Sequence, residues 1–333
     1  MLKNSGAPAT LFPCGALLHS GVLKLIIRKL LQGIIMLLAV SAIAFALLST
    51  AGGDALSALR ENPQVSEETV ERLRKVYELD KPLTSRYFSW LSTTVRGDMG
   101  ESIAFKTDVA ALVFTRLWQT VKLGVLALLI ALLVSLGLAF ASARIRSRLL
   151  ERIVDAVVLV SASTPRIVLA LFALALTVWL SGSAVAIQGG SISAMFLAAF
   201  VLAFPLIALF LAQADGELRR AMNEPYIQFA RAKGLDENTV ILKHASRAAL
   251  NPLLTIFGLS LGALVGGSVI VETILGWPGI GALTVAAVRN RDVPLVMGIV
   301  LISSAAVWAG NTIAEVLQMV NDKRIRDLET DRL

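Results

Sequence analysis

Cysteine and histidine are almost absent from this chain of 333 residues, which has one cysteine, Cys14, and two histidines, His19 and His244. A single cysteine excludes an internal disulfide framework and leaves no thiol cluster for a metal. The sequence has no Gly-x-x-x-x-Gly-Lys-Ser/Thr phosphate-binding loop. It also lacks the interleaved basic and aromatic residues of nucleic-acid-binding surfaces. These absences argue against a metal centre, a P-loop ATPase and a nucleic-acid site.

Hydrophobic residues make up 56% of the chain, more than a water-soluble core of this size needs. A membrane-spanning helix takes roughly 20 mostly apolar residues, because its backbone polar groups must be satisfied within the segment. The segments that meet this requirement are 30–51, 117–142, 153–180, 193–214, 252–271 and 294–320. The sequence therefore predicts an all-α polytopic membrane protein with six transmembrane helices.

Basic residues are concentrated in alternate loops, which sets the expected orientation. With six spans, one side carries Lys24, Arg28 and Lys29, Arg144 to Arg152, Arg219 to Arg247, and Lys323 to Arg332. The short loop 181–191 on the other side has no charge. We therefore expect both termini to be cytoplasmic. We attribute the net charge of +7 to this excess of basic residues on the cytoplasmic side.

The expected organisation follows from these spans. Residues 1–29 form a cytoplasmic N-terminal segment, not expected to be a removed signal peptide. The first transmembrane helix covers 30–51, and an extracytoplasmic helical insertion covers 52–116, with helices at 66–77 and 83–95. A core domain with five transmembrane helices covers 117–320 and includes a cytoplasmic loop at 215–251. Residues 321–333 form a cytoplasmic tail.

The cytoplasmic loop carries two helix signals. Glu224 and Pro225 are typical of a helix start, and Gly234 of a helix end. Asp236 is placed to cap a second helix that reaches about residue 250. Two short helices at the membrane face indicate either a docking site for a soluble partner or a solvated interfacial element.

Particular motifs in this chain resemble those of a known family. They are Tyr-Ile-x-x-Ala-Arg-Ala-Lys-Gly-Leu at 226–235, His-Ala at 244–245, Asn-Pro at 251–252, Glu-Thr-x-x-Gly-Trp-Pro-Gly-Ile-Gly at 272–281, Arg-Asp-x-Pro at 291–294, Arg-Gly-Asp-x-Gly at 96–100 and Gly-Asp at 53–54. Over about 25–326 the chain resembles the B-type permease subunits of bacterial ABC importers for dipeptides, oligopeptides and nickel. Ala55, Trp118 and Lys323 depart from the family's usual residues, which leaves the solute open.

The resemblance implies a transmembrane permease subunit that translocates peptides across the bacterial cytoplasmic membrane by alternating access. It implies no enzymatic activity in this chain, because ATP and Mg would be bound by a partner ATPase. The implied partners are a second homologous permease, one or two cytoplasmic ATPase subunits, an extracytoplasmic solute-binding protein and membrane lipid. The implied ATPase-coupling loop comprises Tyr226, Ala230, Arg231, Ala232, Lys233, Gly234, Leu235 and His244. The alternatives are a nickel or nickel-chelate permease, a membrane-anchored scaffold or sensor, and a passive channel.

Arg166 lies within the third apolar segment, where a charge costs roughly 2.5 to 3.5 kcal/mol on translocon scales. It follows Ser163 and Pro165, and Pro165 frees a backbone carbonyl and favours a kink. We expect Arg166 either to line the translocation pathway and meet an anionic group, or to pair with an acid of a partner permease.

Glu272 precedes a turn containing Trp277, Pro278 and Gly279. Because glycine and proline favour tight turns, one interpretation is an outer gate or a contact with the solute-binding protein. The other is a plain interfacial turn with Trp277 in the headgroup zone.

Gly258 to Gly262 match the Gly-x-Ser-x-Gly nucleophile pattern of hydrolases, but within an apolar segment. Gly258, Gly262 and Gly266 instead predict a small-residue face for helix packing.

Overall fold

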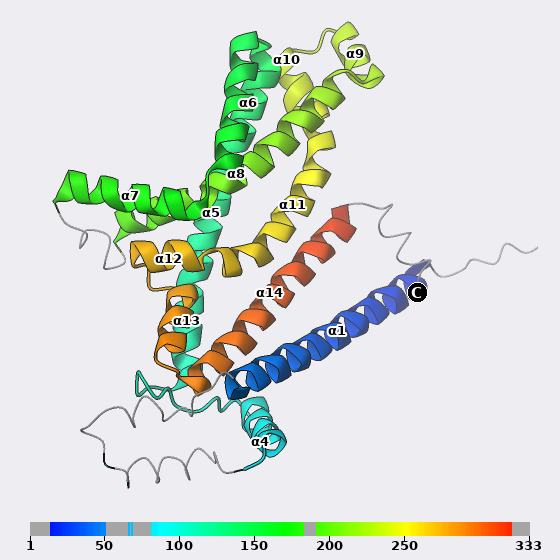
Figure 1. Ribbon diagram of the computed structural model, residues 1–333. Helices are drawn as coiled ribbons and strands as arrows, with labels where there is room; N and C mark the ends of the chain where they lie inside the picture. The colour runs from blue at the N-terminus through cyan, green and yellow to red at the C-terminus, as the bar shows by residue number, and fades with distance from the viewer. Residues whose placement is uncertain (1–13, 51–65, 67, 69–80, 183–190, 322–333) are drawn as a thin grey trace, which may run out of the picture.

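The computed structural model describes residues 14–50, 66, 68, 81–182 and 191–321, and in these ranges most of the chain is helical (Figure 1). The β-pairing found there is one isolated bridge between Glu101 and Asp108. The helices are α1 (Cys14–Thr50), α4 (Leu83–Val95), α5 (Val109–Ile145), α6 (Arg148–Ser163), α7 (Arg166–Ser181), α8 (Ile192–Met222), α9 (Pro225–Ala232), α10 (Glu237–Thr239), a π-helical turn (Val240–Ala245), α11 (Ser246–Gly267), α12 (Val269–Leu275), α13 (Ile280–Arg289) and α14 (Val293–Asn321). The predicted all-α architecture is confirmed.

Four of these helices, α1, α5, α8 and α14, are long and apolar enough to cross a membrane. Two further pairs qualify when each is taken together: α6 with α7, bent by 97°, and α11 with α12, bent by 54°. Counting each bent pair as one span gives six, the predicted number. Two of the six are therefore broken rather than continuous helices.

The core lies between α5 and α8, which pack along most of their length (Figure 1). Along α5, Ala127, Ala131, Ser135 and Ala139 recur every fourth residue and are all buried. Small side chains at this spacing let two helix backbones approach closely. The Ser135 hydroxyl donates to the Ile207 carbonyl of α8 at 3.2 Å, so the polar group in this seam is satisfied.

The two terminal helices run side by side at one edge of the molecule (Figure 1). Lys29 of α1 forms an ion pair with Glu315 of α14. The hydroxyls of Ser41 in α1 and Tyr87 in α4 lie 2.9 Å apart, which fixes α4 beside the far end of α1. The predicted helix at 83–95 coincides with α4.

Some helix boundaries differ from the expected ones. Helix α5 begins at Val109, ahead of the expected span start at residue 117. The third span breaks at Thr164 and Pro165, because a residue before proline disfavours helical backbone, and Arg166 lies at this break, as the first residue of α7. The second loop helix does not stop near residue 250. It continues through the π-helical turn into α11, with Pro252 inside that helix.

Some predictions fall outside the described residues. They concern the segment 1–13, the Gly-Asp motif at 53–54, the tail 322–333 and the helix at 66–77 apart from Ser66 and Glu68.

Candidate functional site

The loop after α8 folds into a short helix with defined ends. Glu224 is the N-cap residue of α9, and Pro225 occupies the first turn, where its missing N–H costs nothing. Gly234 has φ of +78°, a left-handed conformation that glycine adopts without steric cost. Its N–H donates to the Arg231 carbonyl at 2.9 Å. The expected helix start and glycine stop are both confirmed.

Helix α9 has an inner and an outer face. Ile227 and Ala230 point inward and are buried, whereas Tyr226, Phe229 and Leu235 are 47%, 63% and 40% exposed. An exposed aromatic and aliphatic group of this kind at the rim of a protein is typical of an interaction site. Lys233 Nζ lies 4.8 Å from the centre of the Phe229 ring, which places a cation beside the apolar face.

Ion pairs connect this loop to the α5–α6 turn. Arg231 donates to Glu237 through Nη2 at 2.9 Å and through Nε at 3.2 Å. Arg146 donates to the same carboxyl group at 2.9 Å, and Arg144 Nε donates to Asn238 Oδ1 at 2.8 Å. The hydrogen bond from Arg231 is the main cause of a lowered pKa for the Glu237 carboxyl group. Figure 1 accordingly shows α9, α10 and the α5–α6 turn at one end of the molecule.

The residues implied for the coupling loop fall into two groups. Ala232, Lys233 and Gly234 are exposed together with Tyr226 and Leu235, and these can meet a partner. The others are structural in this arrangement: Ala230 is buried, Arg231 is half-buried against Glu237, and His244 is half-buried in the π-helical turn.

Phe229, the most exposed large apolar side chain of α9, was not among those coupling residues. Helical spacing could have identified it, because positions 226, 229 and 233 recur at intervals of three and four residues along one side of the helix.

The break in the third span brings Arg166 to the second broken span. Ser163 ends α6, Thr164 bonds the Val160 carbonyl through its hydroxyl, and Pro165 precedes α7. The guanidinium of half-buried Arg166 lies against Gly267, so closely that a Cβ at that position would collide with Nη1. In the part of the chain that the structure describes, Arg166 has no hydrogen-bonded or ionic partner. The two breaks therefore meet at one point.

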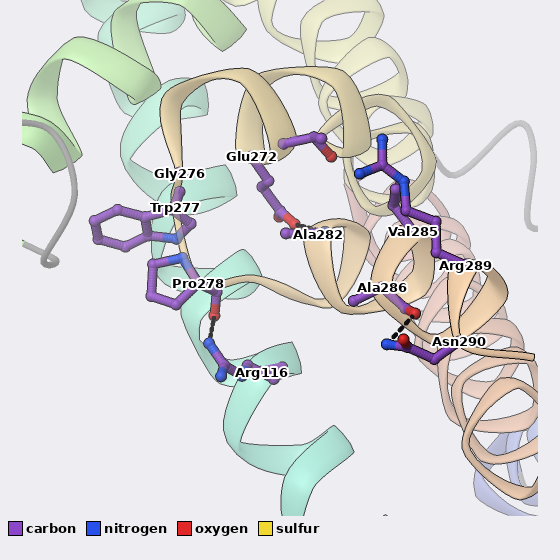
Figure 2. A pocket seen from close by; sticks show the side chains of 11 residues that line it. Arg116, Glu272, Gly276, Trp277, Pro278, Ala282, Val285, Ala286, Arg289 and Asn290 are labelled. Carbon is purple, nitrogen blue, oxygen red and sulfur yellow. Dashed lines mark hydrogen bonds between the residues drawn. The ribbon is translucent and has the colours of Figure 1, made fainter. Parts of the chain in front are cut away.

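The turn between α12 and α13 is built around Glu272, whose side chain is fully buried (Figure 2). Its Oε2 accepts from the N–H groups of Gly281 and Ala282, at 2.7 and 3.1 Å, and these belong to the first turn of α13. Its Oε1 accepts from the Thr120 hydroxyl of α5 at 2.6 Å, and that hydroxyl accepts from the Ile280 N–H at 2.8 Å. Glu272 thus satisfies helix-terminal donors that have no partner within the helix.

The remaining turn residues pack around this group. Trp277 is buried, and its indole N–H donates to the Gln119 carbonyl at 3.2 Å. Gly279 lies against the Glu272 carboxyl group, where a Cβ would collide. The Pro278 carbonyl accepts from Arg116 Nη1 at 3.3 Å (Figure 2). Trp277 therefore lies inside the chain rather than in a headgroup zone. In this conformation the Glu272 carboxyl group makes its hydrogen bonds within the chain.

A second buried carboxyl group, which sequence reasoning did not single out, lies at the start of α14. Asp292 is fully buried, and its Oδ2 accepts from the Ser102 hydroxyl at 2.6 Å and the Ala104 N–H at 2.9 Å. Its Oδ1 accepts from the Leu295 N–H at 3.2 Å. The carboxyl group joins the segment before α5 to the last helix. An Asp preceding Pro294 at a helix start was the available signal.

Comparison with known proteins finds matching family profiles and related sequences. The profile of the family described as "Binding-protein-dependent transport system inner membrane component" matches residues 133–327, and that of the related N-terminal part matches 22–124. The oligopeptide transport system permease protein AppB of Bacillus subtilis is 32% identical over 90% of this chain and 98% of its own. The corresponding protein OppB of Escherichia coli is 30% identical over 92% of this chain and 100% of its own.

Among solved structures, the inward-facing MetNI methionine ABC transporter matches 62% of this chain and 95% of its own, with 19% identity and a TM-score of 0.48. The family match covers more than half of the chain and the relatives cover nearly all of it. The chain therefore belongs to the family of inner membrane components of binding-protein-dependent transport systems, and it is a multi-pass inner membrane protein.

Proposed function

We propose that this chain is a permease subunit of an ATP-driven importer that carries peptides into the cytoplasm by alternating access. Relatives at about 30% identity over nine-tenths of the chain are named oligopeptide permeases, which supports a peptide solute. The observation that carries the coupling mechanism is the exposed apolar surface of α9 and the turn after it. Tyr226, Phe229 and Leu235 form this surface, on a loop braced by Arg231 and Glu237.

In this mechanism, α9 docks on a cytoplasmic ATPase that binds ATP and Mg. Closure of the ATPase pair moves α9, and the bracing to the α5–α6 turn transmits the movement to α5 and α6. A loop without internal bonds would bend instead of transmitting force. A second homologous permease completes the pathway, and an extracytoplasmic solute-binding protein delivers the peptide. We place the end with α9, together with both termini, in the cytoplasm, in line with the positive-inside rule.

The broken spans supply the movable parts of the pathway. Discontinuous helices at membrane depth are found in transporters where backbone lines a cavity or a substrate route. Arg166 lies at the contact between the two breaks, half-exposed, and we assign it to the translocation route together with Ser163 and Pro165. Its guanidinium meets either an anionic solute group or an acid of the second permease.

The test is uptake by proteoliposomes that contain the complete complex with its binding protein. We expect ATP-dependent accumulation of tripeptides, reduced at least about tenfold by Phe229→Ser, because a central apolar anchor contributes about 2 kcal/mol or more to an interface. Phe88→Ser is the matched control, since Phe88 is 64% exposed but lies on α4 at the opposite end.

Uptake of nickel without uptake of peptides would refute a peptide solute and indicate a nickel permease. Peptide conduction without ATP would indicate a channel, and ATPase activity that no solute stimulates would indicate a scaffold.

A further inference from the structure

A hollow of about 430 Å³ lies beside the buried Glu272 group, between the α12–α13 turn and α5. Figure 2 shows its lining, which comes from Arg116 of α5, Glu272 and Thr273 of α12, the turn residues Gly276 to Pro278 and one face of α13. Its volume lies within the roughly 300 to 1,000 Å³ typical of small-molecule sites. In Figure 1, α13 lies in the half of the molecule that carries α4, away from α9, and we assign this half to the outside.

One side of α13 shapes the hollow. Ala282, Val285 and Ala286 line its wall, and Arg289 and Asn290 follow one turn later on the same face. Alanines at this spacing leave open space where larger side chains would fill it. Figure 2 shows the Arg289 side chain reaching from α13 toward α12, across the space that the alanines leave.

Three charged side chains line this space, the cations Arg116 and Arg289 and the carboxyl group of Glu272. Arg289 is exposed, and within the described ranges neither it nor Arg116 forms an ion pair. Arg116 is half-buried and is oriented by its bond to the Pro278 carbonyl, which uses one of its five N–H groups. The acidic group of the lining, Glu272, is fully buried and both of its carboxyl oxygens already accept hydrogen bonds from the chain.

We infer that this hollow binds the C-terminal carboxylate of the peptide, with Arg289 as the principal contact and Arg116 as the second cation. The planar guanidinium matches a carboxylate with two parallel hydrogen bonds. Every linear peptide carries this group whatever its sequence, so one such site serves solutes with different side chains. The inference rests on the proposed peptide import and adds the chemical group that the outer part of this chain recognises.

The test compares tripeptides as free acids with the same tripeptides as C-terminal amides. Uptake into proteoliposomes holding the complete complex is measured by mass spectrometry, at concentrations that fully load the binding protein with each form. For the parent chain we expect acids to be taken up about tenfold faster than amides, the factor that one charge-assisted hydrogen bond of about 1.4 kcal/mol provides. In Arg289→Gln the acid rate should fall to the amide rate, while amide uptake stays unchanged. Arg289→Lys, which keeps the charge but loses the paired geometry, should give an intermediate ratio.

Arg96→Gln is the matched control, because Arg96 is an exposed arginine in the outer segment away from the hollow, and it should keep the parent ratio. An unchanged ratio in Arg289→Gln would overturn the inference while leaving peptide import standing. Equal loss of acid and amide uptake, together with loss of ATPase stimulation by the loaded binding protein, would also overturn it, because Arg289 would then be a docking contact. A ratio of acid to amide uptake that changes with the anionic lipid content of the vesicles would also overturn the inference, because the hollow would then hold a lipid headgroup. No ATP-dependent uptake of either form by the parent chain would instead refute the proposed function.

Discussion

Replacing Glu272 by alanine should open the α12–α13 turn. The side chain is fully buried, and its loss leaves the N–H groups of Gly281 and Ala282 and the hydroxyl of Thr120 without their acceptor. An unsatisfied buried donor costs about 1 to 3 kcal/mol, so the two amides alone predict a loss of about 2 to 6 kcal/mol in local stability. A value of about 3 kcal/mol corresponds to roughly a hundredfold loss of protection against amide hydrogen exchange.

Hydrogen exchange followed by mass spectrometry on the purified complex measures this directly. Peptides covering 276–290 should exchange about a hundredfold faster in Glu272→Ala, while those from α8 should not change. Thr273→Ala is the control, because the exposed Thr273 hydroxyl bonds only the Val269 carbonyl of its own helix. Unchanged exchange over 276–290 in Glu272→Ala, or equal acceleration in both variants, would refute the view that this carboxyl group holds the turn.

Three further predictions concern the loop and the broken spans. Because the pKa of Glu237 is lowered, its pairing with Arg231 stabilises the loop at pH values above the ordinary carboxyl pKa of about 4.5, and this stabilisation is lost as pH falls through the lowered pKa. Limited proteolysis of 225–245 should therefore accelerate at acid pH in the parent chain. In Glu237→Gln, proteolysis of this segment should be fast at every pH. Gly234→Ala should destabilise the loop by about 1 to 2 kcal/mol, because φ is +78° at this position, and it should weaken recovery of the ATPase in pull-downs. Gly216→Ala, in an open position within α8, should do neither. Gly267→Ala should displace Arg166 and lower both uptake and the thermal midpoint, and Gly266→Ala, where a Cβ meets open space, should leave both as they were.

The sequence predicted what depends on local chemistry. Apolar runs of sufficient length indicated the spans, and the bounds of α4 were found because Pro82 precedes it and Arg96-Gly97 follows it. The ends of α9 followed from Glu224-Pro225 and Gly234 in the same way. Each of these signals acts within one helical turn and needs no knowledge of the neighbouring helices.

Features that depend on packing between distant segments could not be predicted. Pro165 indicated a kink, but the 97° bend depends on where α7 finds neighbours. The role of Glu272 requires Thr120, which is 152 positions away, and the role of Asp292 requires Ser102, 190 positions away. Likewise, burial of Ala230 within the motif 226–235 depends on how α9 packs against the π-helical turn.

Photocrosslinking from Phe229 tests most directly that a separate ATPase drives this permease through α9. A photoreactive p-benzoylphenylalanine at position 229, introduced in native membranes, should give an adduct with a cytoplasmic ATP-binding protein. The same group at position 88 should give none, because α4 lies at the other end of the molecule. If position 229 crosslinks only to lipid, or if no ATP-binding protein is crosslinked under conditions that support uptake, the account is contradicted.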